Sequence, residues 1–415
     1  MNQPDPIHLH ANRDGIRYEI RGSVAPGFEK LASQFQEHFA HGLELGANVC
    51  ATVGGQVVAD LWGGFSDRAR QTPWERDTIV CMMSVNKAVS AACIFHAMEQ
   101  GALDVARPVA DYWPAFAANG KAHIPIQWIL DHRSGLPVVE PRLPKGAAYD
   151  HARMSGALAA MKPLWEPGTQ AGYHILSQGY LLAEIIRRAT GRTMGGYFAE
   201  HFAKPLGIDY FVGVPEAELE RCAEFCMVLG GTILDEAAKD PDGWQGRAWH
   251  QLKEGEDFNS REWRTAEICS ANGHGNARAM ARFFAMLAND GVLDGKRILA
   301  SETIRSMSAE QHQLTEVVMQ RPYHQASGVL RNSPPICFQG PNPGSFGHHG
   351  VGGSIGFADP ENRISFSYAT NRMHARKDNG PRAGLLIKQL YEAVGVDCDT
   401  PDYASTPIAS WNRGM

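Results

Sequence analysis

The sequence predicts a fold of the α/β (α+β) class, in which both ends of the chain build one antiparallel sheet and a helical lobe is inserted between them. Two β-hairpin patterns, one near each end, predict the sheet, at residues 47–64 and 354–371. Helical patterns occupy the stretch between the hairpins and predict the lobe. We expect a cleft between the two parts, where binding sites tend to form.

The length of the chain fits this division. At about 150 residues per domain, 415 residues would give two or three domains. We expect instead one sheet domain formed by residues 1–110 and 275–415. Residues 111–274 would form an all-helical lobe inserted between these two parts. Segments far apart in the chain must then meet to form one site.

Each predicted element has a local signal. In the first hairpin, β-rich runs flank Gly54-Gly55, which suits a tight turn. An apolar, alanine-rich helix then starts at Ser84, reaches Met98 and ends at Gly101. The remaining elements follow from the same kinds of pattern: helices over residues 180–188, 276–287 and 381–394, and the second hairpin turning at residues 359–362.

Composition excludes several classes of protein. The chain is 44% hydrophobic and 20% charged, as is typical of globular proteins. Its net charge of −6, with no long basic run, argues against nucleic-acid binding. It has no apolar stretch of membrane-spanning length, and residues 1–6 lack the features of a secretory signal. We expect a cytoplasmic protein with a small-molecule partner, no nucleic-acid or membrane partner, and an undetermined number of subunits.

The eight cysteines are scattered along the chain, which indicates free thiols in a reducing compartment. The one close pair, Cys222 and Cys226, has no second pair or His cluster beside it. Tetrahedral zinc needs three or four ligands at motif spacing, so we expect no metal site there.

Ser84 and Lys87 form an S-x-x-K pattern at the start of a predicted helix, which places both side chains on one face, one turn apart. A serine hydroxyl needs a neighbouring base to act as a nucleophile. A lysine can be that base where burial and the helix N-terminus lower its proton affinity. The pattern alone is also compatible with a helix-capping serine and a solvated lysine.

Tyr173 lies on a turn just before the helix at 180–188, after the phrase WEPGT at residues 165–169. A phenol held near a cationic lysine can relay protons. The alternative is a half-buried tyrosine with a satisfied hydroxyl.

A glycine-rich segment, FGHHGVGGS at residues 346–354, precedes the second hairpin. Glycines in a strand-like context indicate close approach of another backbone or a ligand. An edge strand beside the nucleophile would supply a backbone N–H that forms an oxyanion hole with the N–H of Ser84. The alternative is a glycine-rich turn with surface histidines.

The same segment contains G-x-S-x-G around Ser354, the nucleophile elbow of α/β-hydrolases. That elbow needs a helix after the serine, whereas a strand is predicted here. It also needs a later histidine, and only His374 follows. We therefore do not expect Ser354 to be the nucleophile.

The three motifs and their order resemble the serine β-lactamase and penicillin-binding-protein superfamily, and the resemblance covers roughly residues 47–394. The fold this implies is β-lactamase-like. The phrases LDHRSGLP (130–137), WEPGTQAGYH (165–174) and FGHHGVGGSIGFADP (346–360) are most similar to the class C-like esterases called family VIII carboxylesterases.

The resemblance implies a role for each motif. Ser84 would be the acylated nucleophile and Lys87 its base partner, with Tyr173 a further acid and base. The segment His348-His349-Gly350 would stand where the family has K-T-G, and the N–H of Val351 would hold the oxyanion with that of Ser84. Whether Lys87 or Tyr173 takes the first proton stays open. No metal or organic cofactor is implied.

Two positions depart from the class C pattern. Ile175 replaces the asparagine of Tyr-x-Asn, which removes an amide that would grip a β-lactam or a peptide. His348 replaces the third-motif lysine, and a neutral imidazole attracts a substrate carboxylate less strongly. Both changes favour a neutral ester as substrate.

We therefore expect a serine hydrolase that cleaves carboxylic esters, with short acyl chains, through an acyl-enzyme on Ser84. An amidase, a weak β-lactamase or an acyltransferase using the same site are alternatives, as is a non-catalytic binding protein with the fold. Trp244, Trp249 and Trp263 are expected either to line a substrate pocket or to belong to the core.

Overall fold

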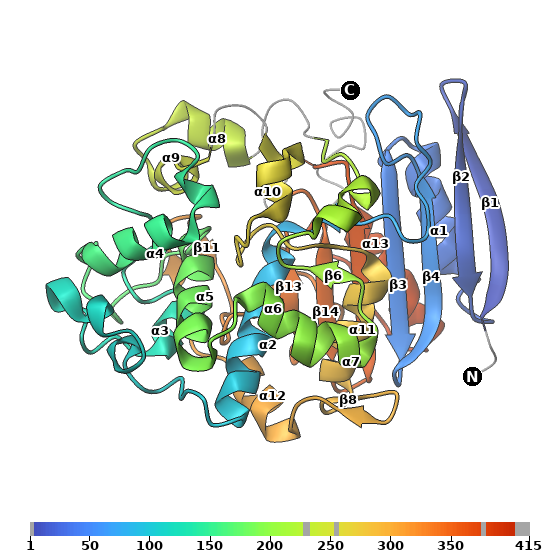
Figure 1. Ribbon diagram of the computed structural model, residues 1–415. Coiled ribbons are helices and arrows are strands. Elements are labelled where there is room, and N and C mark those ends of the chain that lie inside the picture. The colour runs from blue at the N-terminus through green and yellow to red at the C-terminus, as the bar shows by residue number, and fades with distance from the viewer. Residues whose placement is uncertain (1–3, 227–232, 253–256, 375–378, 403–415) are drawn as a thin grey trace.

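The computed structural model describes residues 4–226, 233–252, 257–374 and 379–402. An antiparallel sheet of eight strands crosses the molecule in the order β1-β2-β4-β3-β15-β14-β13-β12 (Figure 1). Its strands come from both ends of the chain, and β3 pairs with β15, as the two hairpin patterns predict. The strands of this sheet are β1 Asp5–Arg13, β2 Ile16–Val24, β3 Gly46–Val53, β4 Gln56–Gly64, β12 Leu330–Arg331, β13 Phe346–His349, β14 Ile355–Asp359 and β15 Ile364–Thr370.

Both predicted hairpins are confirmed. Gly54 and Gly55 have φ angles of 60° and 82°, which a tight turn requires and glycine adopts without strain, and they join β3 to β4. The second hairpin joins β14 to β15, with Asp359 opposite Ile364.

A third hairpin, which was not predicted from the sequence, lies at the edge of the sheet. Strands β1 and β2 pair along their whole length around Asp14-Gly15, where both residues have positive φ angles. Asp-Gly between alternating runs is a strong hairpin signal, so this pair was predictable. Helix α1 (Glu29–Ala40), which follows, was also not predicted.

Helices cover both faces of the sheet (Figure 1). On one face, α1 packs against α13 (Gly380–Ala393) and against the N-terminal strands, and this layer shares a core with Val49 and Ala51 of β3. On the other face, α11 (Ala277–Ala288) packs on β3, β14 and β15 and contacts Cys50. Because side chains alternate along a strand, neighbouring residues of β3 enter opposite cores.

The remaining helices lie mainly on the side of the sheet away from β1 and β2 (Figure 1). Helix α2 (Asn86–Glu99) is buried along nearly its whole length, and α5 (Ser177–Thr190) ends at Gly191 as predicted. The other helices are α3 Ile126–Leu130, α4 His151–Ala160, α6 Met194–Phe198, α7 Lys204–Leu206, α8 Ile233–Lys239, α9 Trp244–Trp249, α10 Arg261–Thr265 and α12 Ser301–Ser308. Short strands outside the main sheet are β5 Val80–Cys81, β6 Tyr210–Phe211, β7 His274–Gly275, β8 Val292–Leu293, β9 Lys296–Arg297, β10 Thr315–Glu316 and β11 Arg321–Pro322.

One hydrophobic core runs through α2, the helical segment and the sheet, and it includes Val89, Ile185 and Phe346. The two predicted parts of the chain therefore share buried surface. Their division at residues 110 and 275 stays a prediction.

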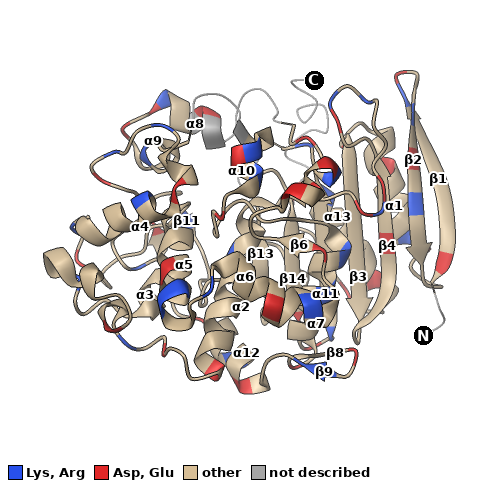
Figure 2. Ribbon diagram, viewed as in Figure 1, with Lys and Arg blue, Asp and Glu red and all other residues tan. Residues whose placement is uncertain are grey.

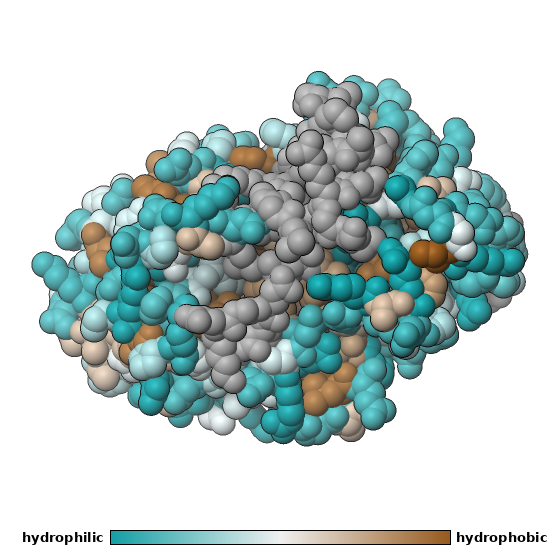
Figure 3. All heavy atoms as spheres, turned by 90° about the horizontal axis from the view of Figure 1, so that it is seen from above, coloured by the Kyte–Doolittle hydropathy of each residue, from teal (hydrophilic) through white to brown (hydrophobic). Residues whose placement is uncertain are grey.

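The surface carries charges of both signs. Acidic and basic residues are interspersed along the elements (Figure 2). Seen from above, hydrophobic side chains form small groups among hydrophilic ones (Figure 3). Within the described part of the chain, no helix combines the length and apolar character needed to cross a membrane.

Candidate active site

Ser84 lies in a single 3₁₀ turn, Met83–Val85, that leads into α2. The residue before it, Met83, has a φ angle of 50°, in the left-handed region that non-glycine residues rarely adopt. Backbone strain of this kind clusters at functional sites, where the surrounding structure holds it. Ser84 itself is half-buried, and the helix that follows it is buried along nearly its whole length.

Lys87 lies in the first turn of α2 and is 1% exposed. Its Nζ donates hydrogen bonds to the carbonyl oxygens of Ile175 (2.9 Å) and Ser270 (3.0 Å). Burial lowers the pKa of Lys87 well below its usual value of 10.5. A neutral amine has two hydrogens and one lone pair, so these two carbonyls satisfy both hydrogens and leave the lone pair for another partner.

Tyr173 lies in the extended segment before α5, beside both residues. The Lys87 Nζ is 4.7 Å from the centroid of the Tyr173 ring. Burial raises the pKa of the Tyr173 phenol well above its usual value, and a hydrogen bond with the Ser84 side chain acts in the opposite direction. The phenol is therefore neutral and in contact with Ser84, so the structure brings the three predicted residues together.

Two residues that the sequence analysis did not assign hold the Tyr173 segment. The buried carboxylate of Glu316 accepts the backbone N–H of Tyr173 (2.8 Å). The ring of His132 lies 4.8 Å from the Tyr173 ring, and its Nδ1 accepts the N–H of His174 (3.2 Å). His132 lies in the LDHRSGLP phrase, which marked it only by resemblance. No sequence signal identified Glu316, because it is 143 positions from Tyr173.

His348, at the end of β13, contacts the other side of the phenol. Its Nε2 lies 3.5 Å from the Tyr173 hydroxyl, and its Nδ1 lies 2.6 Å from the carbonyl oxygen of His349. A carbonyl oxygen only accepts, so Nδ1 carries the proton and Nε2 is bare. Burial lowers the pKa of His348 well below its usual value, with contributions from His349 and Lys87. His348 is therefore neutral and presents an acceptor to Tyr173.

Gly350 brings the glycine-rich segment against the chain that precedes Ser84. A Cβ at Gly350 would lie 2.3 Å from the carbonyl oxygen of Met82 and 3.0 Å from the Met83 Cβ, so only glycine allows this approach. The Gly350 N–H donates to the carbonyl of Ser354 (2.7 Å). The next N–H, that of half-buried Val351, is therefore the candidate partner for the N–H of Ser84.

The prediction that the glycine-rich segment forms the edge strand of the sheet is wrong. Strand β13 is the second strand from the edge, because β12 lies outside it. However, β12 pairs only with Phe346 and Gly347, and the His348-His349 end extends beyond it. The outer strand is too short to cover the end of β13 that reaches the site.

The structure also shows where Ser354, the alternative nucleophile, and the three tryptophans of the helical segment lie. Ser354 is 3% exposed and leads into strand β14, so a nucleophile elbow, which needs a helix after the serine, is not formed there. Trp263 and Trp249 are buried core residues. Trp244 is half-buried and packs edge-on against Trp165, whose ring lies where a Cβ on Gly172 would be, next to Tyr173.

All eight cysteines are free thiols, and the described residues contain no group of three or more His, Cys, Asp or Glu that could hold a metal ion. Cys222 donates to a helix carbonyl and Cys226 lies beside Arg372 in a backbone bridge.

The chain was compared with known families, proteins and structures. The sequence model of the Beta-lactamase family matches residues 35–390. The protein named Esterase/beta-lactamase LipL of Mycobacterium tuberculosis is 32% identical over 392 residues, which cover 88% of this chain and 86% of LipL.

Two solved structures are similar over nearly the whole chain. A family VIII carboxylesterase superposes with a TM-score of 0.84 at 35% identity, covering 90% of this chain and 99% of its own. A penicillin-binding protein homologue from Caulobacter crescentus superposes with a TM-score of 0.83 at 35% identity and the same coverage.

Proposed function

This chain belongs to the Beta-lactamase family and is a hydrolase with that family's fold, and from this premise we propose that it cleaves carboxylic esters through an acyl-enzyme on Ser84. The observation that carries the proposal is that the Lys87 Nζ lies 4.7 Å from the centroid of the Tyr173 ring and that the phenol interacts with the Ser84 side chain. A preference for short acyl chains is inferred from the resemblance to family VIII carboxylesterases.

In the first step, the Ser84 Oγ attacks the carbonyl carbon of the ester. Lys87 is the better candidate to take the serine proton, because burial lowers its pKa and so favours the neutral amine, which has a lone pair, whereas burial keeps Tyr173 protonated. The proton moves either directly or through the Tyr173 hydroxyl. The carbonyl electrons move onto the oxygen, where the N–H groups of Ser84 and Val351 stabilise the negative charge.

In the second step, the tetrahedral intermediate collapses and the C–O bond to the alcohol breaks. The departing alkoxide takes the Tyr173 proton, and Lys87 returns a proton to the phenol. Water then attacks the acyl-enzyme with the same two groups acting as base and acid, and Ser84 is released. No group outside the chain is needed for the proton balance.

His348 places a neutral group in the site, where a lysine at the same position would place a positive charge. Its bare Nε2 accepts from the Tyr173 hydroxyl, so it orients the phenol without carrying a charge. A neutral imidazole offers no cation to a substrate carboxylate. Ile175 contributes its backbone carbonyl to Lys87 and buries its side chain. Both residues favour an uncharged ester over a β-lactam or peptide carboxylate.

β-Lactam hydrolysis is a second candidate, because the name of the similar mycobacterial protein carries both activities. Ester hydrolysis and β-lactam hydrolysis both begin with acyl transfer to the serine. They differ in which substrate the site accepts.

The test is hydrolysis of p-nitrophenyl acetate, butyrate and octanoate, with a chromogenic cephalosporin assayed in parallel. We expect the wild type to cleave the acetate and butyrate esters with the highest kcat/KM and Ser84→Ala to lose at least roughly a thousandfold in kcat. Ser354→Ala is the matched control and should keep its activity. Cephalosporin turnover faster than ester turnover would replace the ester proposal by the β-lactamase one, and undiminished activity of Ser84→Ala would refute both.

A further inference from the structure

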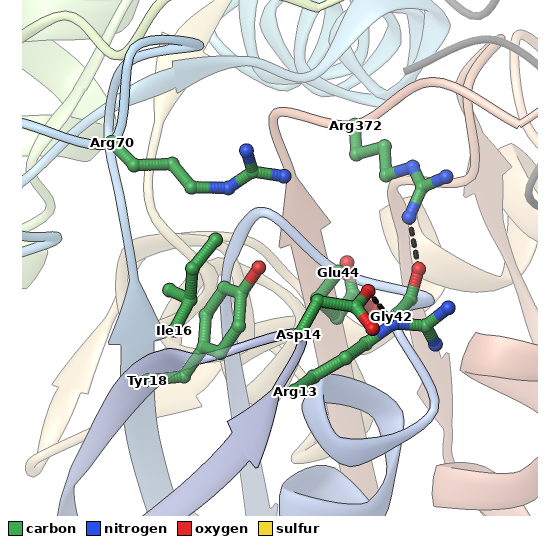
Figure 4. A pocket seen from close by; sticks show the side chains of 8 residues that line it. All are labelled: Arg13, Asp14, Ile16, Tyr18, Gly42, Glu44, Arg70 and Arg372. Atoms are coloured by element: carbon green, nitrogen blue, oxygen red, sulfur yellow. Dashed lines mark hydrogen bonds and ion pairs between the residues drawn. The ribbon is translucent and has the colours of Figure 1, made fainter.

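A cavity of about 260 Å³ lies beside the β1–β2 hairpin, at the edge of the sheet that the N-terminal strands form. It shares no residue with the candidate active site. Four separate segments form it: the β1–β2 hairpin, the loop after α1, the loop around residue 70, and the residues that follow β15. The lining residues are Arg13, Asp14, Ile16, Tyr18, Gly42, Glu44, Arg70 and Arg372 (Figure 4).

Both acidic residues in the wall are already neutralised. Glu44 is fully buried and accepts hydrogen bonds from Arg382 (3.0 Å) and the Thr370 hydroxyl (2.8 Å). Asp14 is exposed at the rim and accepts from the Arg13 Nε (3.1 Å). The acidic groups therefore do not make the cavity repel an anion.

Arg372 is a buried part of the wall, with 4% of its surface exposed. Its Nη1 donates to the carbonyl of Gly42. Burial lowers its pKa to about 10, and the nearby Arg382 acts in the same direction, so the guanidinium is still charged at neutral pH. A guanidinium carries five N–H donors, so one that already has hydrogen-bond partners can bind an anion as well.

Tyr18 supplies an unused polar group. The residue is 3% exposed, and in the described part of the chain its hydroxyl has no hydrogen-bond partner. Figure 4 shows this hydroxyl pointing into the space between Arg70 on one side and Arg372 on the other. A phenolic hydroxyl can donate a hydrogen bond, so it would offer a donor to a ligand oxygen in the cavity.

We propose that this cavity binds a phosphate group, either free inorganic phosphate or the phosphate of a small monoester. Donors reach the cavity from three directions, from Arg70, Arg372 and Tyr18, which suits a tetrahedral oxyanion better than a planar carboxylate (Figure 4). Arginine binds phosphate through paired, charge-assisted hydrogen bonds. The volume accommodates a phosphate with a small substituent.

The test is isothermal titration calorimetry of the full chain with inorganic phosphate, phenyl phosphate and succinate, each at the same ionic strength. We expect saturable binding of phosphate, with phenyl phosphate bound as well if the site takes monoesters. Arg70→Gln should weaken phosphate binding roughly tenfold or more, and Tyr18→Phe, which removes only the hydroxyl, roughly two- to tenfold.

Arg68→Gln is the matched control, because Arg68 lies in the same loop, is half-exposed, pairs with Glu224 and does not line the cavity. Its phosphate affinity should change less than twofold. The proposal is overturned if the wild type shows no saturable phosphate binding, if succinate binds and phosphate does not, or if Arg68→Gln weakens binding as much as Arg70→Gln. It is also overturned if neither Tyr18→Phe nor Arg70→Gln changes the affinity.

Discussion

At the scale of single residues, the environment of Lys87 decides whether it can act as a base. An exposed lysine is protonated at neutral pH and cannot accept a proton from serine. Lys87 is 1% exposed, and the one cause that lowers its pKa is burial. The S-x-x-K spacing predicted the position of the lysine, but not the two carbonyl groups, from distant segments, that bind it.

The pH dependence of catalysis follows from this burial. Burial disfavours the ammonium form, so the neutral amine becomes the main form at a lower pH than in an exposed lysine. The esterase kcat/KM should therefore rise with pH along one ionisation whose pKa is well below 10.5, and be lost as the pH falls through it. Measuring kcat/KM for p-nitrophenyl butyrate between pH 5 and pH 9, as a rough working range, tests this.

The control is Lys87→Met, which keeps the length and packing of the side chain and removes the amine. We expect it to lose about 10²- to 10⁴-fold in kcat across the whole range. If Lys87→Met kept the same pH limb as the wild type, another group would be the base.

At the scale of elements, the end of β13 and the turn before α2 form one unit. Gly350 lies against the Met82 carbonyl so closely that any side chain would collide with backbone. Val351 follows Gly350 directly, and the oxyanion hole that we propose pairs its N–H with that of Ser84. The role of the glycine is therefore steric rather than a matter of chain flexibility.

Gly350→Ala should damage catalysis while the fold persists. The added Cβ would lie 2.3 Å from a carbonyl oxygen, so one of the two segments must shift. Misplacing one oxyanion donor costs about 10²- to 10³-fold in kcat. We expect a loss of this size in ester hydrolysis, with KM changed less than kcat.

Gly156→Ala is the matched control, because Gly156 is an exposed position within α4 where a Cβ meets nothing within 4 Å. It should keep full activity and stabilise the protein by roughly 0.5–1 kcal/mol, as measured by urea unfolding. Equal activity in both variants would contradict the assignment of the Gly350 segment to the oxyanion hole.

The elements that sequence patterns predicted are those with local signals. Paired glycines at 54 and 55 and the turn after Asp359 define two hairpins, and both occur in the structure. Glu316 could not be found in this way, because its function depends on a hydrogen bond to Tyr173 that only the folded chain creates. The phosphate cavity was missed for the same reason, since its arginines come from three separate parts of the chain.

At the scale of the whole molecule, the site exists only because the sheet joins the two ends of the chain. Ser84 and Lys87 belong to the first quarter, Tyr173 enters from the helical segment, and His348 to Val351 come from the C-terminal strands. The order of three motifs in the sequence predicted this meeting, and the family match agrees with it. The identity of the substrate depends on the walls of the site, which no motif encodes.

The most direct test of the central claim is covalent labelling with a serine-directed p-nitrophenyl phosphonate, followed by peptide mapping with mass spectrometry. We expect one phosphonyl group per chain, on the peptide that carries Ser84, with loss of activity in proportion to labelling. Ser84→Ala should not be labelled, and Ser354→Ala should be labelled like the wild type. An adduct on Ser354, or labelling that persists in Ser84→Ala, would contradict the claim that Ser84 forms the acyl-enzyme.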